Sequence, residues 1–207
     1  MINLKILYQN LLKDHGPQGW WPINNKYHPG DYSYPKNDSQ RFEICIGAIL
    51  TQNTSWKNVE RALDNLRKKK LLDARKLIIA DDQLIKNCIK PAGYFNQKAK
   101  KLKIFAEFFI KLKKRIPIRD ELLSLWGIGK ETADSILLYA YDQPIFVIDT
   151  YTRKFLLNQN IIKEKELNHM TYEDIKLFFQ ENLPKDYKLF QEYHALIVQY
   201  GKNLQNN

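Results

Sequence analysis

The chain has 207 residues, 44% of them hydrophobic, so it has the composition of a globular protein with a buried core and not of a disordered one. It contains only eight glycines and eight prolines, and few segments alternate like strands, which favours an all-helical (all-α) fold. The net charge of +10 indicates a polyanionic partner, although a basic protein with a solvated surface would show the same balance. No apolar run is long enough to span a membrane and the first residues lack signal-peptide features, so we expect a soluble, cytoplasmic protein.

The first element expected is a helix over residues 2–14, which the sequence His15-Gly16-Pro17 ends. Residues 16–38 are rich in glycine, proline, asparagine and aromatic side chains, and they predict an ordered loop. Trp20 and Trp21 stand out in this loop. They either plug the core beneath it or form an aromatic wall for a base-sized pocket, because any nucleobase can stack on an aromatic ring.

A second helix is expected over residues 41–50, and the polar segment 51–54 then breaks the apolar pattern. Asn53 or Thr54 could serve as the N-cap of the next helix, which begins near Trp56. Trp56 could be an ordinary buried core residue. The polar turn therefore has a structural explanation of its own.

An amphipathic helix is expected over residues 57–70, followed by two short helices within 73–90 and a long helix over 95–114. Seven lysines lie on the long helix, at positions 98, 100, 101, 103, 111, 113 and 114. Some of them could face phosphate, but we expect most to be exposed to solvent.

A glycine-containing turn joins two further helices, the first opening at Pro117 and the second covering residues 132–140. Gly127 and Gly129 predict a tight turn with positive φ angles. Such a turn would leave the amides of Ile128, Gly129 and Lys130 free at a helix N-terminus, which is a favourable place for an anion such as a backbone phosphate. A plain bend between two packed helices is the alternative.

Asp149 directly follows the apolar run 145–148 and precedes a helix expected over residues 150–157. Taken alone, the residue reads as an N-cap. A capping pattern at 171–174 opens another helix, and the last helix is expected over residues 187–203. His194 on this last helix reads as a core or structural histidine. Cys45 and Cys88 each lie in an apolar helical context and are expected to be reduced core residues.

Several of these motifs together resemble the helix-hairpin-helix DNA glycosylases of the endonuclease III superfamily. The residues that carry the resemblance, over most of the chain, are Gly47-Ala48-Ile49-Leu50-Thr51-Gln52-Asn53-Thr54, 93–99, 125–134, Val147-Ile148-Asp149-Thr150-Tyr151 and 193–198. Residues 50–54, with Trp20-Trp21-Pro22 upstream, look most like the 3-methyladenine DNA glycosylase III branch and its endonuclease III-related relatives.

The resemblance implies two helical lobes, one of residues 40–147 and one of residues 1–39 plus 148–207, with a DNA-binding cleft between them. It implies that Asp149 is the catalytic carboxylate and that Gln52 intercalates into the DNA. The base pocket would comprise Trp20, Trp21, Pro22 and Trp56. The phosphate-binding hairpin would comprise Gly127, Ile128, Gly129, Lys130 and Thr132.

Many members of the superfamily hold a [4Fe–4S] cluster on four cysteines. This chain has only two, so we expect no cluster, no metal and no other cofactor. Bifunctional relatives place a Schiff-base lysine two residues after the second glycine of the hairpin, where this chain has Glu131. We therefore expect a monofunctional glycosylase, although Lys130 leaves a lyase activity open.

An electron-rich pocket of tryptophans would favour cationic alkylated purines, chiefly 3-methyladenine. The alternatives are mismatched thymine or uracil, oxidised bases, or a non-catalytic DNA-binding protein. The expected partner is double-stranded DNA with a damaged base. We expect a monomer associated with the nucleoid.

Overall fold

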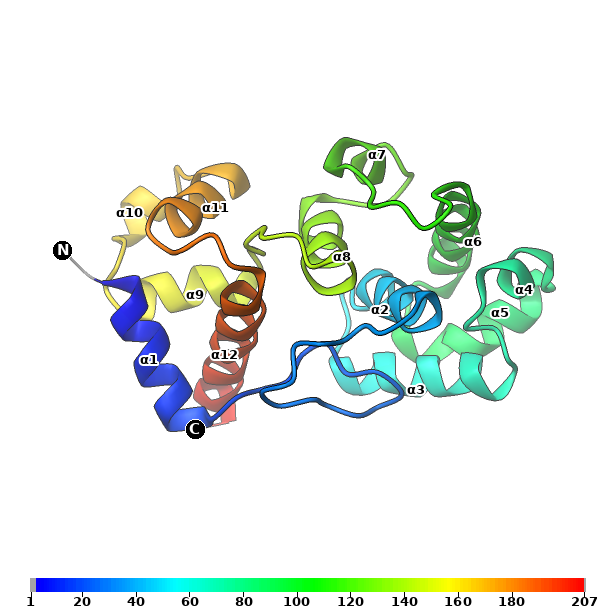
Figure 1. Ribbon diagram of the computed structural model, residues 1–207, viewed down its shortest axis with the longest axis horizontal. Coiled ribbons are helices and arrows are strands. Elements are labelled where there is room, and N and C mark those ends of the chain that lie inside the picture. The colour runs from blue at the N-terminus through cyan, green and yellow to red at the C-terminus, as the bar shows by residue number, and fades with distance from the viewer. Residues whose placement is uncertain (1–2, 207) are drawn as a thin grey trace. The chain divides into compact units, whose positions relative to one another are not determined.

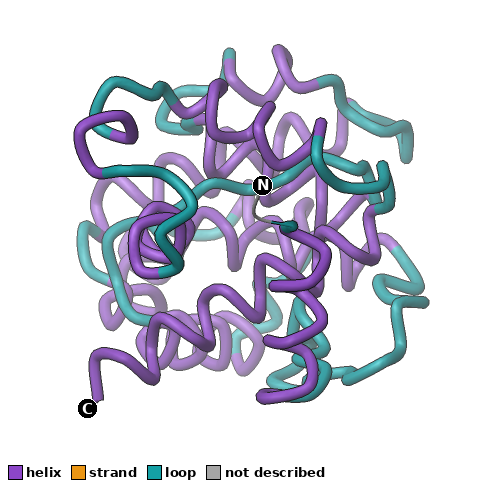
Figure 2. Tube along the Cα trace, turned by 90° about the vertical axis from the view of Figure 1, so that its left-hand side faces the viewer, coloured by secondary structure: helices purple, strands orange, loops and turns teal. Residues whose placement is uncertain are grey.

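The structure is a computed structural model that describes residues 3–206, so the start of the first predicted helix at residue 2 lies outside the described residues. Within this range the chain forms helices joined by loops, and the only strand-like pairing is an isolated bridge between Ile23 and Lys26 (Figure 2). The all-α prediction is therefore confirmed. None of the helices among these residues has the length and apolar character that crossing a membrane requires.

The chain divides into two compact units. The first consists of Met1–Trp21, Tyr27–Tyr32 and Asp142–Asn207. Its helices are α1 (Leu4–His15), α9 (Thr150–Asn158), α10 (Glu164–Leu167), α11 (Tyr172–Glu181) and α12 (Tyr187–Asn206). Helix α12 packs against both α1 and α9 (Figure 1). The core of this unit is aromatic: the ring of Phe146 stacks on Phe179 at 4.1 Å between centroids, and Phe190 and Tyr193 pack edge-on against Phe146.

The second unit consists of Pro22–Lys26 and Ser33–Tyr141. It contains α2 (Asp38–Leu50), α3 (Trp56–Lys68), α4 (Ala74–Ile79), α5 (Asp82–Ile89), the 3-10 turn η1 (Lys90–Ala92), α6 (Phe95–Lys111), α7 (Arg119–Leu123) and α8 (Lys130–Tyr141). Helix α2 is buried from Phe42 to Leu50 and packs against α3, α6 and α8. A helix that is apolar all round needs neighbours on every side, and these three helices provide them.

Local capping explains several of the helix boundaries. Asn3, Asn37, Asp73 and Asp81 each accept a hydrogen bond from a backbone N–H of the first turn that follows. The N-cap of α3 is Ser55, so the expectation that Asn53 or Thr54 would cap this helix was wrong. Helix α10, only four residues long, was not predicted at all.

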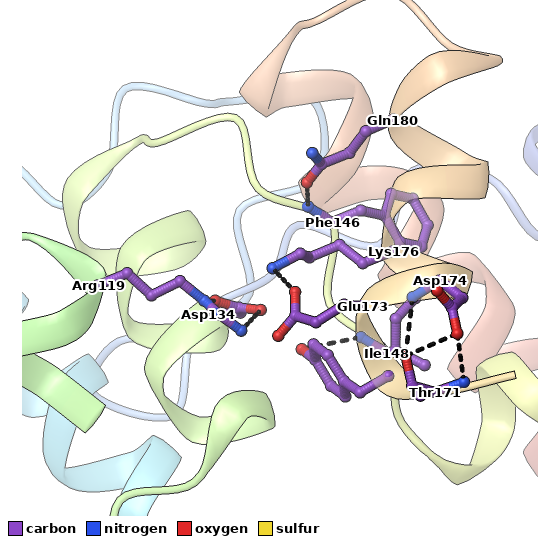
Figure 3. Close-up of polar contacts among 10 residues, drawn as sticks. Arg119, Asp134, Phe146, Ile148, Thr171, Glu173, Asp174, Lys176 and Gln180 are labelled. Atoms are coloured by element: carbon purple, nitrogen blue, oxygen red, sulfur yellow. Dashed lines mark hydrogen bonds and ion pairs between the residues drawn. The ribbon is translucent and has the colours of Figure 1, made fainter. Parts of the chain in front are cut away.

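The segment that leads into Asp149 is fixed by side chains of α11 (Figure 3). The backbone N–H of Phe146 donates to Oε1 of Gln180 at 3.0 Å, and the N–H of Ile148 donates to the hydroxyl of Tyr172 at 3.4 Å. Helix α11 is itself capped by Thr171, whose hydroxyl receives the N–H of Asp174. These bonds fix the segment before Asp149, which is not part of a sheet, and so position Asp149 at the start of α9.

Candidate functional site

Asp149 occupies the N-cap of α9. Its Oδ1 accepts two hydrogen bonds from Thr152, one from the backbone N–H at 2.7 Å and one from the hydroxyl at 2.8 Å. Its Oδ2 lies 3.5 Å from Nε2 of His194 on α12. The side chain is 14% exposed, so the carboxylate is enclosed but still accessible. The N-cap interpretation is confirmed, and the geometry leaves Oδ2 with capacity for a further partner.

The surroundings of Asp149 favour its ionised form. Burial alone would raise the pKa of this carboxyl, but His194 and the two donors of Thr152 outweigh burial and hold the pKa below its usual range. The group is therefore an anion at neutral pH. An enclosed anion with an unsaturated oxygen can stabilise a nearby positive charge or orient a water molecule.

His194 connects this carboxylate to the tryptophans of the loop. The ring of Trp20 meets the imidazole edge-on, with 6.0 Å between centroids and an interplanar angle of 82°. Trp20 also packs edge-on against Trp21 at 6.1 Å, and Nζ of Lys202 lies 5.7 Å from the Trp20 ring centroid. Trp21 is buried, whereas Trp20 is partly exposed. The first unit thus places Asp149, His194 and Trp20 in one continuous group.

The loop that carries these tryptophans is ordered, as predicted. The buried carboxylate of Glu192 on α12 accepts the backbone N–H of Gln18 at 2.5 Å and the hydroxyl of Tyr32 at 2.8 Å. Gly19, between them, has φ +67°, and a Cβ there would lie 2.3 Å from the backbone of Pro29. Only glycine fits this close approach, which fixes the chain just before Trp20.

The helix-turn-helix at residues 119–141 is held together by a buried ion pair. Nε of Arg119 on α7 lies 2.5 Å from Oδ1 of Asp134 on α8, and a second guanidinium nitrogen lies 3.0 Å from Oδ2 (Figure 3). Asp134 is fully buried. A two-pronged bond of this kind fixes both distance and orientation between the two helices.

The turn between these helices agrees only in part with the sequence prediction. Gly127 has φ +81°, and a Cβ there would lie 2.3 Å from Cε of Lys101, so glycine is required as expected. Gly129 does not have a positive φ, and Ile128 donates its N–H to the carbonyl of Leu125 at 3.1 Å, so both of those expectations were wrong. The space where a Cβ of Gly129 would lie is open. An incoming group can therefore approach the backbone at the N-terminus of α8.

Gln52 is anchored to this turn. Its Nε2 donates to the carbonyl of Gly127 at 3.0 Å and to the hydroxyl of Thr132 at 2.9 Å, and its Oε1 accepts Nζ of Lys101 at 2.5 Å. The adjacent Asn53 is exposed and has φ +53°. Hydrogen bonds of Gln52 therefore join the polar turn at 51–54 to the glycine turn within the second unit.

A buried lysine supports the same turn from beneath. Nζ of Lys98 on α6 donates to three carbonyls, those of Leu50 at 2.9 Å, Gln52 at 2.7 Å and Ala92 at 2.9 Å. Burial, with a contribution from the charge of Lys101, lowers the pKa of Lys98 to about 8. The expectation of an exposed lysine was wrong at position 98, because these carbonyls satisfy its ammonium group in the interior.

The remaining predicted site residues are placed as follows. Trp56 opens α3, half-buried, and its Nε1 donates to Oε1 of Glu60 at 2.9 Å. Pro22 is buried and belongs, like Trp56, to the second unit, whereas Trp20 and Trp21 belong to the first. Lys130 is exposed at the first position of α8.

The structure adds four residues that sequence reasoning did not single out for the site: His194, Lys98, Lys101 and Asp134. Three of them lie within the motifs that resemble the family and Lys101 is one of the lysines of the long helix, but the sequence did not show their partners, because each partner lies in a different element. The two cysteines are both buried, and burial raises the pKa of each thiol. The described residues contain no group of three or more His, Cys, Asp or Glu side chains that could hold a metal ion.

Comparison with known proteins identifies the family. The HhH-GPD superfamily of base excision DNA repair proteins matches residues 46–181. The Methanocaldococcus jannaschii protein named "Putative DNA repair glycosylase MJ1434" is 43% identical over 207 residues, which cover 95% of this chain and 86% of the relative. Endonuclease III of Thermotoga maritima is 25% identical over 179 residues, 83% of this chain and 78% of the relative.

Solved structures agree with this match. The Helicobacter pylori 3-methyladenine DNA glycosylase MagIII, bound to 1,N6-ethenoadenine, superposes with a TM-score of 0.77 at 26% identity, covering 98% of this chain and 99% of that one. A non-covalent endonuclease III–DNA complex gives a TM-score of 0.75 at 16% identity over 98% of this chain and 87% of that one, which shows a shared fold. Because the family match spans more than half of the sequence and the archaeal relative nearly all of it, this chain belongs to the HhH-GPD superfamily of base excision DNA repair proteins.

Proposed function

We propose that this DNA glycosylase is monofunctional and that it hydrolyses the N-glycosidic bond of an alkylated purine, 3-methyladenine above all, in double-stranded DNA. The observation that carries the proposal is Asp149. Its carboxylate is ionised and enclosed, with 14% of the side chain exposed; Oδ1 accepts two hydrogen bonds from Thr152, and Oδ2 lies 3.5 Å from Nε2 of His194. A carboxylate presented in this way matches what glycosidic cleavage requires.

The chemistry follows from the charge that develops on the sugar. The target nucleotide first leaves the base stack, a step that costs least for a damaged pair. As the bond from C1′ to the base lengthens, the sugar becomes an oxocarbenium-like cation, which the Asp149 carboxylate stabilises. The electrons of the broken bond leave with the base. Oδ2 orients a water molecule whose oxygen bonds to C1′, and the water's proton passes to the carboxylate.

The residues at the start of α8 support hydrolysis without strand cleavage. Glu131 occupies the position where the bifunctional relatives carry their Schiff-base lysine, and a carboxylate cannot form an imine. Lys130 is the adjacent residue, but neighbouring residues on a helix point about 100° apart. Its exposed side chain at the first position of α8 suits a phosphate contact instead.

The proposed substrate class follows from the aromatic side chains. The ring of Trp20 is partly exposed, and the electron-rich face of an aromatic ring attracts electron-poor or cationic bases. A cationic purine is also a good leaving group, so it needs no general acid. MagIII, at 26% identity, is named a 3-methyladenine DNA glycosylase, which supports the same class of base.

The proposed DNA-binding surface lies in the second unit. The N-terminus of α8, the open space at Gly129 and the charge of Lys130 would bind a backbone phosphate, with Gly127, Ile128 and Thr132 shaping the turn. Gln52, bonded to that turn, would enter the gap left by the flipped base. Insertion of its amide requires that some of its bonds to the turn be exchanged for bonds to the orphaned base.

The test is release of free bases from methylated duplex DNA by the wild type, Asp149→Asn and a control, Asp14→Asn, which changes an exposed aspartate of the same unit. We expect the wild type and the control to release 3-methyladenine and leave alkali-labile, uncut strands. Asp149→Asn should lose at least about a hundredfold in rate.

Borohydride added during turnover should trap no protein–DNA adduct. A trapped adduct would contradict the monofunctional mode. If methylated DNA releases no base but mismatched or oxidised substrates do, the alkylpurine assignment is wrong. Equal activity of Asp149→Asn would remove the catalytic role of that residue.

A further inference from the structure

We propose that His194 is a positioning residue that holds Oδ2 of Asp149 toward the substrate. The inference rests on the proposed function of Asp149 and extends it to a second residue. Residues of two helices contact the Asp149 carboxylate. Thr152 of α9 donates two hydrogen bonds to Oδ1, and Nε2 of His194 on α12 lies 3.5 Å from Oδ2.

The imidazole has little freedom to leave this position. Its side chain is 6% exposed, and Trp20 covers it edge-on at 6.0 Å. Helix α12 is packed against α9, so the spacing between His194 and Asp149 is set by helix packing rather than by a flexible loop. Oδ1 has both of its bonds from Thr152, so any water or sugar atom that the carboxylate serves must approach Oδ2, the oxygen beside His194.

Other ionisable groups lie on the elements around this part of α12. They are Asp149 and Tyr151 from α9, Tyr8 from α1, Tyr32 from the loop, Asp142 before α9, and Glu192, Tyr193 and Lys202 on α12 itself. Burial raises the pKa of the phenols of Tyr8, Tyr32 and Tyr193, so these stay neutral at physiological pH. Glu192 is occupied by Gln18 and Tyr32. The carboxylate that lies 3.5 Å from Nε2 of His194 is that of Asp149.

The consequence is a carboxylate held in one orientation. Thr152 and His194 lie on two different helices, and together they restrict rotation of the Asp149 side chain. Losing His194 should therefore lower kcat more than it changes KM, because the orientation of the carboxylate matters most in the transition state.

Two substitutions test the positioning role. His194→Gln keeps a side-chain donor, so its kcat should stay within about threefold of the wild type. His194→Ala removes the donor, so kcat should fall about tenfold while KM changes less than threefold. The matched control is His169→Gln, an exposed histidine of the same unit, which should keep the wild-type kcat.

A measurement without substrate distinguishes failure of this inference from failure of the proposed function. The carboxyl titration of Asp149, followed by carbon-detected NMR, should move to higher pH in His194→Ala, because His194 is among the groups that lower this pKa. An unmoved titration, or a His194→Gln enzyme whose kcat falls as far as that of His194→Ala, would overturn the inference. If the titration moves but no substrate releases a base, the pairing stands and the proposed function fails.

Discussion

Replacing Lys98 by methionine should destabilise the protein, and the structure sets the size of the effect. The ammonium group of Lys98 reaches three carbonyls at 2.7 to 2.9 Å, and the side chain is 2% exposed. Methionine fills a similar volume but cannot donate a hydrogen bond. The carbonyls of Leu50, Gln52 and Ala92 would then lose this donor.

Each buried acceptor left unsatisfied costs about 1 kcal/mol, so the three together predict a loss of roughly 3 kcal/mol in the free energy of unfolding. For a chain of this length, that corresponds to a fall in Tm of about 6 to 12 °C. The removal of a buried charge offsets part of the loss, so the prediction is an upper estimate.

The assay is urea unfolding of Lys98→Met beside Lys111→Met, an exposed lysine of the same helix. Lys111→Met should change the free energy of unfolding by less than about 0.5 kcal/mol. If Lys98→Met costs less than 1 kcal/mol, or no more than its control, then the three carbonyls do not depend on this ammonium group and the reasoning is refuted.

The same pair of variants tests the pKa of Lys98. Its folded value of about 8 lies below the unfolded value of about 10.4, so between these pH values the unfolded chain binds more protons than the folded one. The stability of the wild type relative to Lys98→Met should therefore rise as pH increases from 8 to 10, by at most about 1.4 kcal/mol per pH unit. A relative stability that falls over this range would contradict the lowered pKa.

Three further predictions concern the hairpin and its neighbours. Arg119→Met removes the guanidinium bonds to the buried carboxylate of Asp134 and should cost about 3 to 5 kcal/mol in urea unfolding. Adding Asp134→Leu should recover most of that loss; no recovery would mean that the cost is not electrostatic. Gln52→Ala should lose about 1 to 2 kcal/mol of stability and more base-release activity than Asn53→Ala, which changes an exposed side chain; the reverse order of activities would point to Asn53 as the residue that enters the DNA. Glu131→Lys should create an adduct that borohydride traps on abasic DNA, and its absence would show that this position does not reach the sugar.

Much of the fold could be predicted from the sequence because its signals are local. Apolar residues at helical spacing marked α2, α3, α6, α8 and α12, and a capping pattern marked the start of α11. The positive φ at Gly127 followed from residue type alone. Helix α10 was not predicted because four residues are too few to show a helical periodicity.

In the candidate site, too, the features that could be predicted are those with a local signal in the sequence. Asp149 was recognisable from its place after an apolar run and from the resemblance of its motif. Its capping by Thr152 is also a local effect, since the two residues are three apart. The motif and the cap depend on residues close together in the sequence, so both can be predicted without the tertiary structure.

The contacts between residues far apart in the sequence are decided only by the tertiary structure. His194 is 45 positions from Asp149 and becomes its neighbour through the packing of α12 on α9. Lys98, expected on the surface, is internal because carbonyls from two separate segments converge on its ammonium group. The sequence determines which chemical groups are available and which helices form. The partner of each buried charge is determined by how those helices pack, because burial removes water as the alternative partner and makes the cost of a missing one large.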